Sequence, residues 1–161
     1  EAPLSAEILA ADGVQEVFAR HGSYLLPLAF PEGSPLHPAY TSGHATVAGA
    51  CVTILKAWFD ESAPIANPVQ PSADGSGLEP YAGPTLTVGG ELDKVAANIG
   101  NGRNFSGVHW RTDFTEGAKL GEAVAISILR EQSGSYPEAH SFTLRTFSGS
   151  VIRISGGKIT G

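Results

Sequence analysis

Three consecutive residues, Ser42, Gly43 and His44, have types that suit an anion-binding site. They begin a segment whose composition predicts a helix. The first backbone N–H groups of a helix lack partners within it, and with the helix dipole they attract negative charge. Ser42 can donate its hydroxyl, Gly43 lets a ligand approach the backbone, and the dipole disfavours the cationic form of His44, which could then accept a proton. The simpler alternative is that Ser42 only caps the helix and His44 is a partly buried polar residue.

A second group of residues follows about sixty positions later. Arg103 precedes His109 by six residues, and Asp113 follows His109 by four. The guanidinium of an arginine is a planar fork of donors that suits a tetrahedral oxyanion. Residues four apart share one face of a helix, so the Asp113 carboxylate could hold one imidazole N–H of His109. The other ring nitrogen is then free to act as a nucleophile or a metal ligand. Taken alone, such a pair is also common as a surface or capping pair.

Hydrophobic periodicity predicts four helices that would position these residues. They cover residues 4–21, 42–60, 87–101 and 108–132. The first is broken near Asp12-Gly13, where Asp12 and Gln15 form an N-terminal capping pattern. Near the C-terminus, runs that alternate at period two flank Ser148-Gly149, so residues 142–155 predict a β-hairpin. The expected fold class is therefore mainly α, a helical bundle with a C-terminal β-hairpin.

The expected helices differ in how much of their surface should be buried. Residues 42–60 are apolar nearly all round and rich in small side chains, which predicts a buried, closely packed helix. Within it, Cys51 is expected to be a small buried hydrophobe. Each later helix should turn one apolar face inward. For helix 87–101 that face comprises Leu92, Val95, Ala96 and Ile99, and for helix 108–132 it comprises Leu120, Val124, Ile126, Ile128 and Leu129.

The segments between these helices are rich in proline and glycine. Prolines are expected to make residues 22–41 a stiff loop. Residues 61–84 form a long connection for a compact domain, which indicates a functional loop or a lid. Asp74 and Glu79 within it lack the spacing of a calcium loop, so we predict no metal there. A glycine-rich bend, GNGRNFSG, should follow helix 87–101.

Composition excludes several classes of function. The 161 residues carry 10 Lys and Arg against 16 Asp and Glu, a net charge of −6, which argues against binding to nucleic acid. No apolar run has the length of a membrane span. The single cysteine excludes an internal disulfide. The chain holds no methionine, not even at its start, so we expect a processed product or the C-terminal part of a longer protein.

The two groups of residues together match a two-part signature. SGH at a helix start, followed by R-x5-H-x3-D, resembles the C-terminal signature shared by vanadium-dependent haloperoxidases and acid phosphatases of the same superfamily. The flanking sequences FPEGSPLHPAYTSGHATVAGACVTILKAWF and GELDKVAANIGNGRNFSGVHWRTDFTEGAKLGEAVAISIL resemble the bromoperoxidases of marine algae and cyanobacteria. The resemblance is good over residues 25–60 and 85–155 and poor over the first twenty. It implies that residues 1–161 are the C-terminal part of a haloperoxidase catalytic domain, with the helical bundle of that superfamily.

The resemblance also implies a role for each residue of the signature. His109 matches the histidine whose Nε2 binds the vanadium of a vanadate cofactor, and Asp113 matches its hydrogen-bonding partner. Arg103, the Ser42 hydroxyl and the Gly43 N–H match the groups that bind the vanadate oxygens. His44 matches the acid–base histidine. The implied catalytic residues are therefore His44, His109 and Arg103.

A further histidine bears on the choice of halide. His37, seven residues before His44, falls where bromoperoxidases carry histidine and fungal chloroperoxidases carry phenylalanine. The resemblance therefore implies oxidation of bromide and iodide rather than efficient oxidation of chloride. The alternative is that His37 is a polar loop residue held before Pro38.

Two departures from the family pattern stand out. Thr41 replaces the proline of the common PSGH, which loosens the turn but removes no ligand. The family also uses an upstream Lys-x6-Arg-Pro element, and no lysine of this chain is followed by Arg-Pro at that spacing. One arginine is little positive charge for a multiply charged anion. We therefore expect an N-terminal segment or chain to supply a lysine and an arginine.

The expected activity is the oxidation of bromide and iodide by hydrogen peroxide to hypohalous acid, which halogenates an organic acceptor. One alternative is an acid phosphatase in which His109 is the nucleophile and His44 protonates the leaving group. A second alternative is a non-catalytic oxyanion-binding fragment that needs a partner chain. The family implies a homo-oligomer, and a secreted or cell-wall or periplasmic location.

Overall fold

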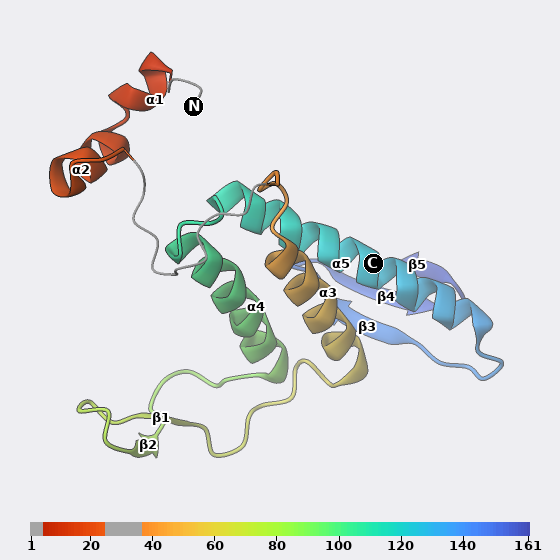
Figure 1. Cartoon of the computed structure of the whole chain (residues 1–161). Helices are drawn as coiled ribbons and strands as arrows, with labels where there is room; N and C mark the ends of the chain where they lie inside the picture. The colour runs from red at the N-terminus through yellow and green to blue at the C-terminus, as the bar shows by residue number, and fades with distance from the viewer. Residues whose placement is uncertain (1–4, 25–36) are drawn as a thin grey trace.

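The computed structural model describes residues 5–24 and 37–161. Two short helices, α1 (Ala6–Ala10) and α2 (Asp12–His21), stand apart from three longer ones (Figure 1). The longer helices are α3 (Gly43–Trp58), α4 (Val88–Phe105) and α5 (Arg111–Ser135), and a three-stranded sheet packs against α3 and α5. The mainly α fold class is therefore confirmed. No helix in the described part of the chain is long and apolar enough to cross a membrane.

The N-terminal helix expected over residues 4–21 is two helices. Ser5 caps α1 by accepting a hydrogen bond from the N–H of Ile8, and the chain is extended at Ala11 (φ −68°, ψ 130°) before α2 begins. The predicted capping role of Asp12 is wrong: Ala11 holds the cap position without a side-chain bond, and Asp12 lies in the first turn. No residue of α1 or α2 is buried, so these helices add nothing to the core of the described structure.

Helix α3 lies at the centre of the fold and contacts α4, α5 and the sheet. Ser42 caps it, as its Oγ accepts a hydrogen bond from the N–H of Ala45 at 3.4 Å. Only one face is buried, formed by Ala45, Ala48, Gly49, Val52, Thr53 and Lys56. The prediction of a helix buried all round is therefore wrong, and Cys51 is exposed rather than buried.

Helices α3 and α5 cross closely because glycines face the partner backbone. A Cβ added to Gly49 or Gly121 would collide with the backbone of the other helix, and one added to Gly117 would lie 2.8 Å from the carbonyl oxygen of Ser42. Close approach of two helices needs such small residues at the crossing. This crossing fixes the start of α3 against the first turns of α5.

Helix α4 is longer than expected. Thr87 caps it by accepting from the N–H of Gly90, and the helix runs on through the predicted glycine-rich bend to Phe105. Gly100 lies inside this helix, and because it has no Cβ, the ring of Phe114 from α5 can pack directly against it. The chain turns only at Ser106 and Gly107, whose positive φ of 79° suits glycine at the end of a helix.

The buried faces of α4 and α5 consist mostly of small residues. On α4, Ala96 is buried, whereas Val95 and Ile99 are 51% and 40% exposed. On α5, the inward residues are Gly117, Ala118, Gly121, Ala125 and Leu129. The prediction that Leu120, Val124 and Ile128 point inward is wrong, since they are 47%, 46% and 45% exposed. Apolar residues recur at intervals of three and four on two faces of α5. The close crossing with α3 buries the face that consists mostly of glycine and alanine.

The C-terminal sheet contains the expected hairpin and one further strand. Strand β3 (Phe142–Arg145) pairs with β4 (Val151–Ser155), which pairs with β5 (Lys158–Thr160), all antiparallel. Leu144 and Ile154 are fully buried against Leu129 of α5. The three-residue strand β5 was missed because so short a run shows no clear alternation.

The connection 61–84 carries a small β-hairpin, β1 (Val69–Pro71) with β2 (Leu78–Pro80), which extends away from the helices (Figure 1). Its tip is closed by Asp74, which accepts hydrogen bonds from Ser72 and Ser76; these bonds lower the pKa of Asp74 to about 2. Within the described residues no cluster of His, Cys, Asp and Glu could hold a metal ion. A role of this segment as a lid stays a prediction. The stiff loop expected over 22–41 lies largely outside the described residues.

Candidate functional site

The imidazole of His109 is held by Asp113. Nδ1 of His109 lies 3.2 Å from Oδ2 of Asp113, and the side chains of the two residues are only 7% and 4% exposed. A carboxylate can only accept, so Nδ1 donates in this bond, and in the neutral ring Nε2 is the nitrogen that keeps its lone pair. The predicted contact is present, but its geometry differs from the expectation. His109 precedes the N-cap residue Trp110 and so lies before α5, not on its face.

Asp113 also organises the start of its own helix. Its Oδ2 accepts the backbone N–H of Trp110 at 3.1 Å, in addition to Nδ1 of His109. A carboxylate in the first turn is favoured by the helix dipole. The His109–Trp110 segment is therefore anchored to the first turn of α5 by one carboxylate oxygen.

The start of α3 is joined to the same turn. The backbone N–H of Ser42 donates to the carbonyl oxygen of Asp113 at 3.1 Å, and Ser42 is fully buried. Gly43 is exposed, and a Cβ added to it would meet no atom within 4 Å. His44 is exposed in the first turn of α3. The N-terminus of α3 thus has open space at Gly43 and is held to the first turn of α5 at Asp113.

Arg103 lies in the last turn of α4, partly buried, with its Nε atom buried. Its carbonyl oxygen accepts the N–H of Val108 at 3.3 Å, which folds the connection back over the end of the helix. The end of α4 and the starts of α3 and α5 thus meet at one end of the helical group, as Figure 1 shows. The fold brings Ser42, Arg103, His109 and Asp113 toward this end.

The described contacts do not join the side chain of His37 or that of His44 to the other predicted site residues. His37 is exposed, and its Nδ1 donates to the carbonyl oxygen of Pro38 at 2.9 Å. Residues 25–36, just before it, lie outside the described residues. The prediction that His37 shapes halide preference stays a prediction.

Sequence analysis missed a buried lysine, Lys56, that is paired with carboxylates at the start of α4. The ammonium of Lys56, 2% exposed, lies 3.0 Å from Asp93 and 3.7 Å from Glu61, and so ties α3 to the start of α4. Glu122 of α5 accepts the N–H of Phe147, and burial raises the pKa of its carboxyl. The available signal was the presence of Lys56 and Glu122 within otherwise apolar runs, because buried charges in such runs need partners.

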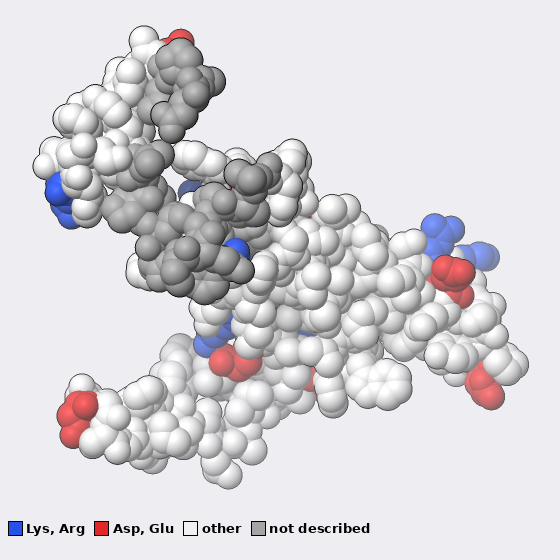
Figure 2. All heavy atoms as spheres, in the orientation of Figure 1, with Lys and Arg blue, Asp and Glu red and all other residues white. Residues whose placement is uncertain are grey.

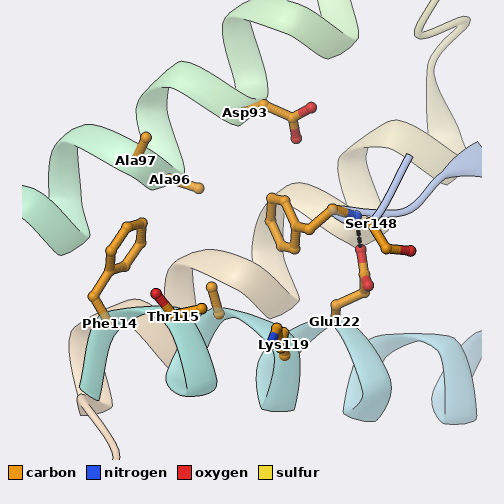
Figure 3. A pocket seen from close by; sticks show the side chains of 10 residues that line it. Asp93, Ala96, Ala97, Phe114, Thr115, Lys119, Glu122 and Ser148 are labelled. Carbon is orange, nitrogen blue, oxygen red and sulfur yellow. Dashed lines mark hydrogen bonds between the residues drawn. The ribbon is translucent and has the colours of Figure 1, made fainter. Parts of the chain in front are cut away.

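A cavity of about 470 Å³ lies between α4 and α5, and Asp93 and Glu122 are among the residues that line it. Figure 3 shows Ala96, Ala97 and Asp93 of α4 on one side and Phe114, Thr115 and Glu122 of α5 on the other. Phe114 directly follows Asp113, so one end of the cavity lies beside the candidate site.

Charge on the surface agrees with the composition. On the face shown in Figure 2, Lys and Arg side chains occur in small separate groups, and most of the surface carries neither sign. Nothing on that face forms the continuous basic surface that nucleic-acid binding requires.

The ends of three helices thus meet around a histidine whose ring is held by a carboxylate. The chain belongs to the family described as the VCPO second helical-bundle domain, which its residues 11–138 match. This membership confirms both the resemblance and the helical-bundle fold.

Three curated proteins similar to this chain are named vanadium-dependent bromoperoxidases. The chain is 54% identical over 134 residues to a vanadium-dependent bromoperoxidase of Corallina pilulifera and to one of Corallina officinalis, covering 82% of this chain and 22% of each relative. It is 42% identical over 135 residues to a vanadium-dependent bromoperoxidase of Ascophyllum nodosum, covering 82% of this chain and 24% of that protein. The chain therefore spans about a fifth to a quarter of the length of these curated relatives.

Proposed function

We propose that this chain forms the vanadate-binding part of a bromoperoxidase, which oxidises bromide and iodide with hydrogen peroxide. The observation that carries the proposal is the His109–Asp113 pair, joined through the Asp113 carbonyl to the start of α3. The similarity to three vanadium-dependent bromoperoxidases supports it.

The residues at this end of the fold fit vanadate. Nε2 of His109 has a lone pair that a metal can accept, because Nδ1 is committed to Asp113. The space in front of Gly43 admits an oxyanion close to the backbone N–H groups that begin α3. The Ser42 Oγ that caps α3 still has a hydrogen to donate, and Arg103 contributes a guanidinium suited to oxyanions.

In the proposed reaction each of these residues has a definite task. Vanadate, when bound, supplies a Lewis acid that activates hydrogen peroxide toward halide. His109 holds the cofactor through Nε2, and Asp113 holds the ring of His109. Arg103, Ser42 and Gly43 offset the negative charge of the oxyanion. His44 takes and returns a proton at its imidazole nitrogen, since halide, peroxide and a proton give hypohalous acid and water.

The site as described needs more positive charge, and we propose that a preceding segment supplies a lysine and an arginine. The sequence holds no Lys-x6-Arg-Pro, and Lys56 is committed to carboxylates beneath α4. Large apolar residues remain exposed on α5, at Leu120, Val124 and Ile128, as expected of a surface covered by another part of the protein or by a second copy.

A halogenation assay with vanadate, peroxide and bromide, set beside a phosphatase assay, tests the proposal. We expect bromination of an organic acceptor that depends on added vanadate, and little hydrolysis of a phosphate ester. Phosphate-ester hydrolysis without halogenation would point to the phosphatase alternative, in which His109 is the nucleophile. Vanadate binding without either activity in the complete protein would point to a non-catalytic oxyanion-binding protein.

A further inference from the structure

The amide of Asn104 faces the connection that carries His109. Asn104 follows Arg103 in the last turn of α4. With its nitrogen turned toward the connection, its amide donates to the carbonyl oxygen of Trp110 at 3.1 Å and to that of His109 at 3.2 Å. In the opposite orientation the amide oxygen of Asn104 would face the carbonyl oxygens of His109 and Trp110, and none of the three could donate. The hydrogen-bond network therefore assigns the amide nitrogen to this side.

These bonds complete a set of restraints on two residues. Asp113 accepts from Nδ1 of His109 and from the N–H of Trp110, and so fixes the imidazole and one peptide group. Asn104 holds the two carbonyl groups of the same dipeptide from the side of α4. A histidine ring is placed by the direction of its Cα–Cβ bond as well as by its side-chain torsions. Asp113 can restrain the torsions, and Asn104 restrains the backbone from which the bond projects.

Asn104 also connects two halves of the site that lie on different elements. Arg103 and Asn104 are neighbours in one helical turn, so a bond from Asn104 to the His109 carbonyl ties the position of Arg103 to that of His109. The backbone contributes further ties to the end of α4: the N–H groups of Ser106, Gly107 and Val108 donate to the carbonyl oxygens of Gly102, Asn104 and Arg103 at 3.0, 3.0 and 3.3 Å. These bonds, and the Ser106 hydroxyl that donates to the carbonyl oxygen of Gly102, hold the beginning of the connection, whereas the amide of Asn104 reaches the carbonyl groups of His109 and Trp110.

We infer that Asn104 is a positioning residue, which sets the separation of His109 and Arg103 through the backbone carbonyls of His109 and Trp110. The inference rests on the proposed vanadate site and deepens it. Partners that orient a metal ligand typically change metal affinity by about 10- to 100-fold when removed. Asp113 contacts the imidazole directly, whereas Asn104 contacts only the backbone that carries it. We therefore expect the loss of affinity on removing the Asn104 amide to lie at the lower end of that range.

The test is vanadate binding by equilibrium dialysis to the complete protein, its preceding segment included. Asn104→Leu keeps the volume and removes the donor. We expect its dissociation constant to rise about tenfold. Asn101→Leu is the matched control, an exposed asparagine three residues earlier on the same helix, and should bind like the wild type. If Asn104→Leu does not fold, Asn104→Ser, which is too short to reach both carbonyls, replaces it in the same comparison.

A double-mutant cycle separates positioning from a general loss of structure. If Asn104 and Asp113 act through the same imidazole, Asn104→Leu combined with Asp113→Asn should weaken binding less than the product of the two single effects. Wild-type affinity in Asn104→Leu, or effects that multiply fully, would overturn the inference. If His109→Ala also keeps tight binding, the vanadate site itself is wrong; if His109→Ala loses it while Asn104→Leu does not, only the role of Asn104 is wrong.

Discussion

At the scale of single residues, Asp113 contacts several parts of the candidate site. Its carboxylate holds His109 and the N–H of Trp110, and its carbonyl holds the N–H of Ser42. A single buried residue therefore links the imidazole, the first turn of α5 and the start of α3. Asp113 therefore holds the start of α3 and the start of α5 at fixed positions around His109.

Replacing His109 by alanine should abolish vanadate binding. The change removes the side chain that we propose as the protein ligand to vanadium, and hydrogen bonds from Ser42, Gly43 and Arg103 alone do not replace a coordinate bond. Equilibrium dialysis with vanadate measures the effect, with His21→Ala, an exposed histidine of α2, as the control. Tight binding by His109→Ala would show that another residue is the ligand.

Replacing His44 by alanine should leave vanadate bound and slow turnover. His44 is exposed on the first turn of α3, where it can exchange protons with solvent and with a group in front of Gly43. General acid–base groups contribute about 10²- to 10⁴-fold to rate. Parallel measurement of vanadate affinity and bromide oxidation separates the two effects. A parallel loss of both would make His44 a binding residue.

The halide preference should depend on His37. We expect the wild-type protein to oxidise bromide much better than chloride, and His37→Phe to raise the relative use of chloride. The reason is the place of His37 in the loop that leads into α3, seven residues before His44. A competition assay with mixed halides on both proteins checks this. Equal use of chloride by the wild type would contradict it.

At the scale of elements, the crossing of α3 and α5 should be the part most sensitive to added volume. In Gly117→Ala the new methyl lies 2.8 Å from the Ser42 carbonyl oxygen and 3.2 Å from the Ala45 Cβ. Overpacking of this kind costs about 1–3 kcal/mol, and it displaces Ser42, so vanadate affinity should fall as well.

Gly102→Ala on α4 is the matched control for this prediction. A Cβ there meets no atom within 4 Å, and alanine favours a helix over glycine by about 0.5–1 kcal/mol. Denaturant unfolding of both variants gives the free energies of unfolding. If Gly117→Ala proves as stable as Gly102→Ala, the close crossing is not a constraint on this fold.

The same crossing explains why the positions of the helices along the chain were easier to predict than which face of each helix is buried. Capping residues are local, so Ser42 marked the start of α3 correctly, and the sequence placed the start of α4 at Thr85 or at Thr87, which is the cap observed. Which face of α5 is buried depends on how closely α3 approaches, and that is decided by glycines on both helices. Hydrophobic periodicity gives weight to large side chains, and so it selected Leu120, Val124 and Ile128 where glycine and alanine are inside.

At the scale of the whole molecule, the roles of Ser42, Arg103 and His109 stay predictions that rest on the family signature, whereas the contact between His109 and Asp113 is present as expected. The sequence alone placed His109 on a helix, because the spacing could not show that Trp110 is the N-cap of α5. Asn104 was missed because its partners are backbone carbonyls, which leave no pattern in side-chain types.

The final prediction concerns residues 1–161 expressed alone. Proposed vanadate binding requires more cationic charge than Arg103 and the start of α3 provide. Exposed apolar residues on α3 and α5, among them Val47 at 63%, Leu55 at 38% and Leu120 at 47%, need a covering surface. The isolated chain should therefore bind hydrophobic dyes, aggregate at moderate concentration and show no bromide oxidation.

Adding the proposed upstream segment, with its Lys-x6-Arg-Pro element, should restore both solubility and vanadate-dependent halogenation, because we expect it to supply further cations and to cover the apolar helices. The same segment with its lysine replaced by alanine is the control that separates the two contributions: it should restore solubility but little activity. Dye binding, sedimentation and a bromination assay measure the three properties on the same preparations. A stable monomer of residues 1–161 that oxidises bromide with vanadate and peroxide would show that the cations of this chain are sufficient.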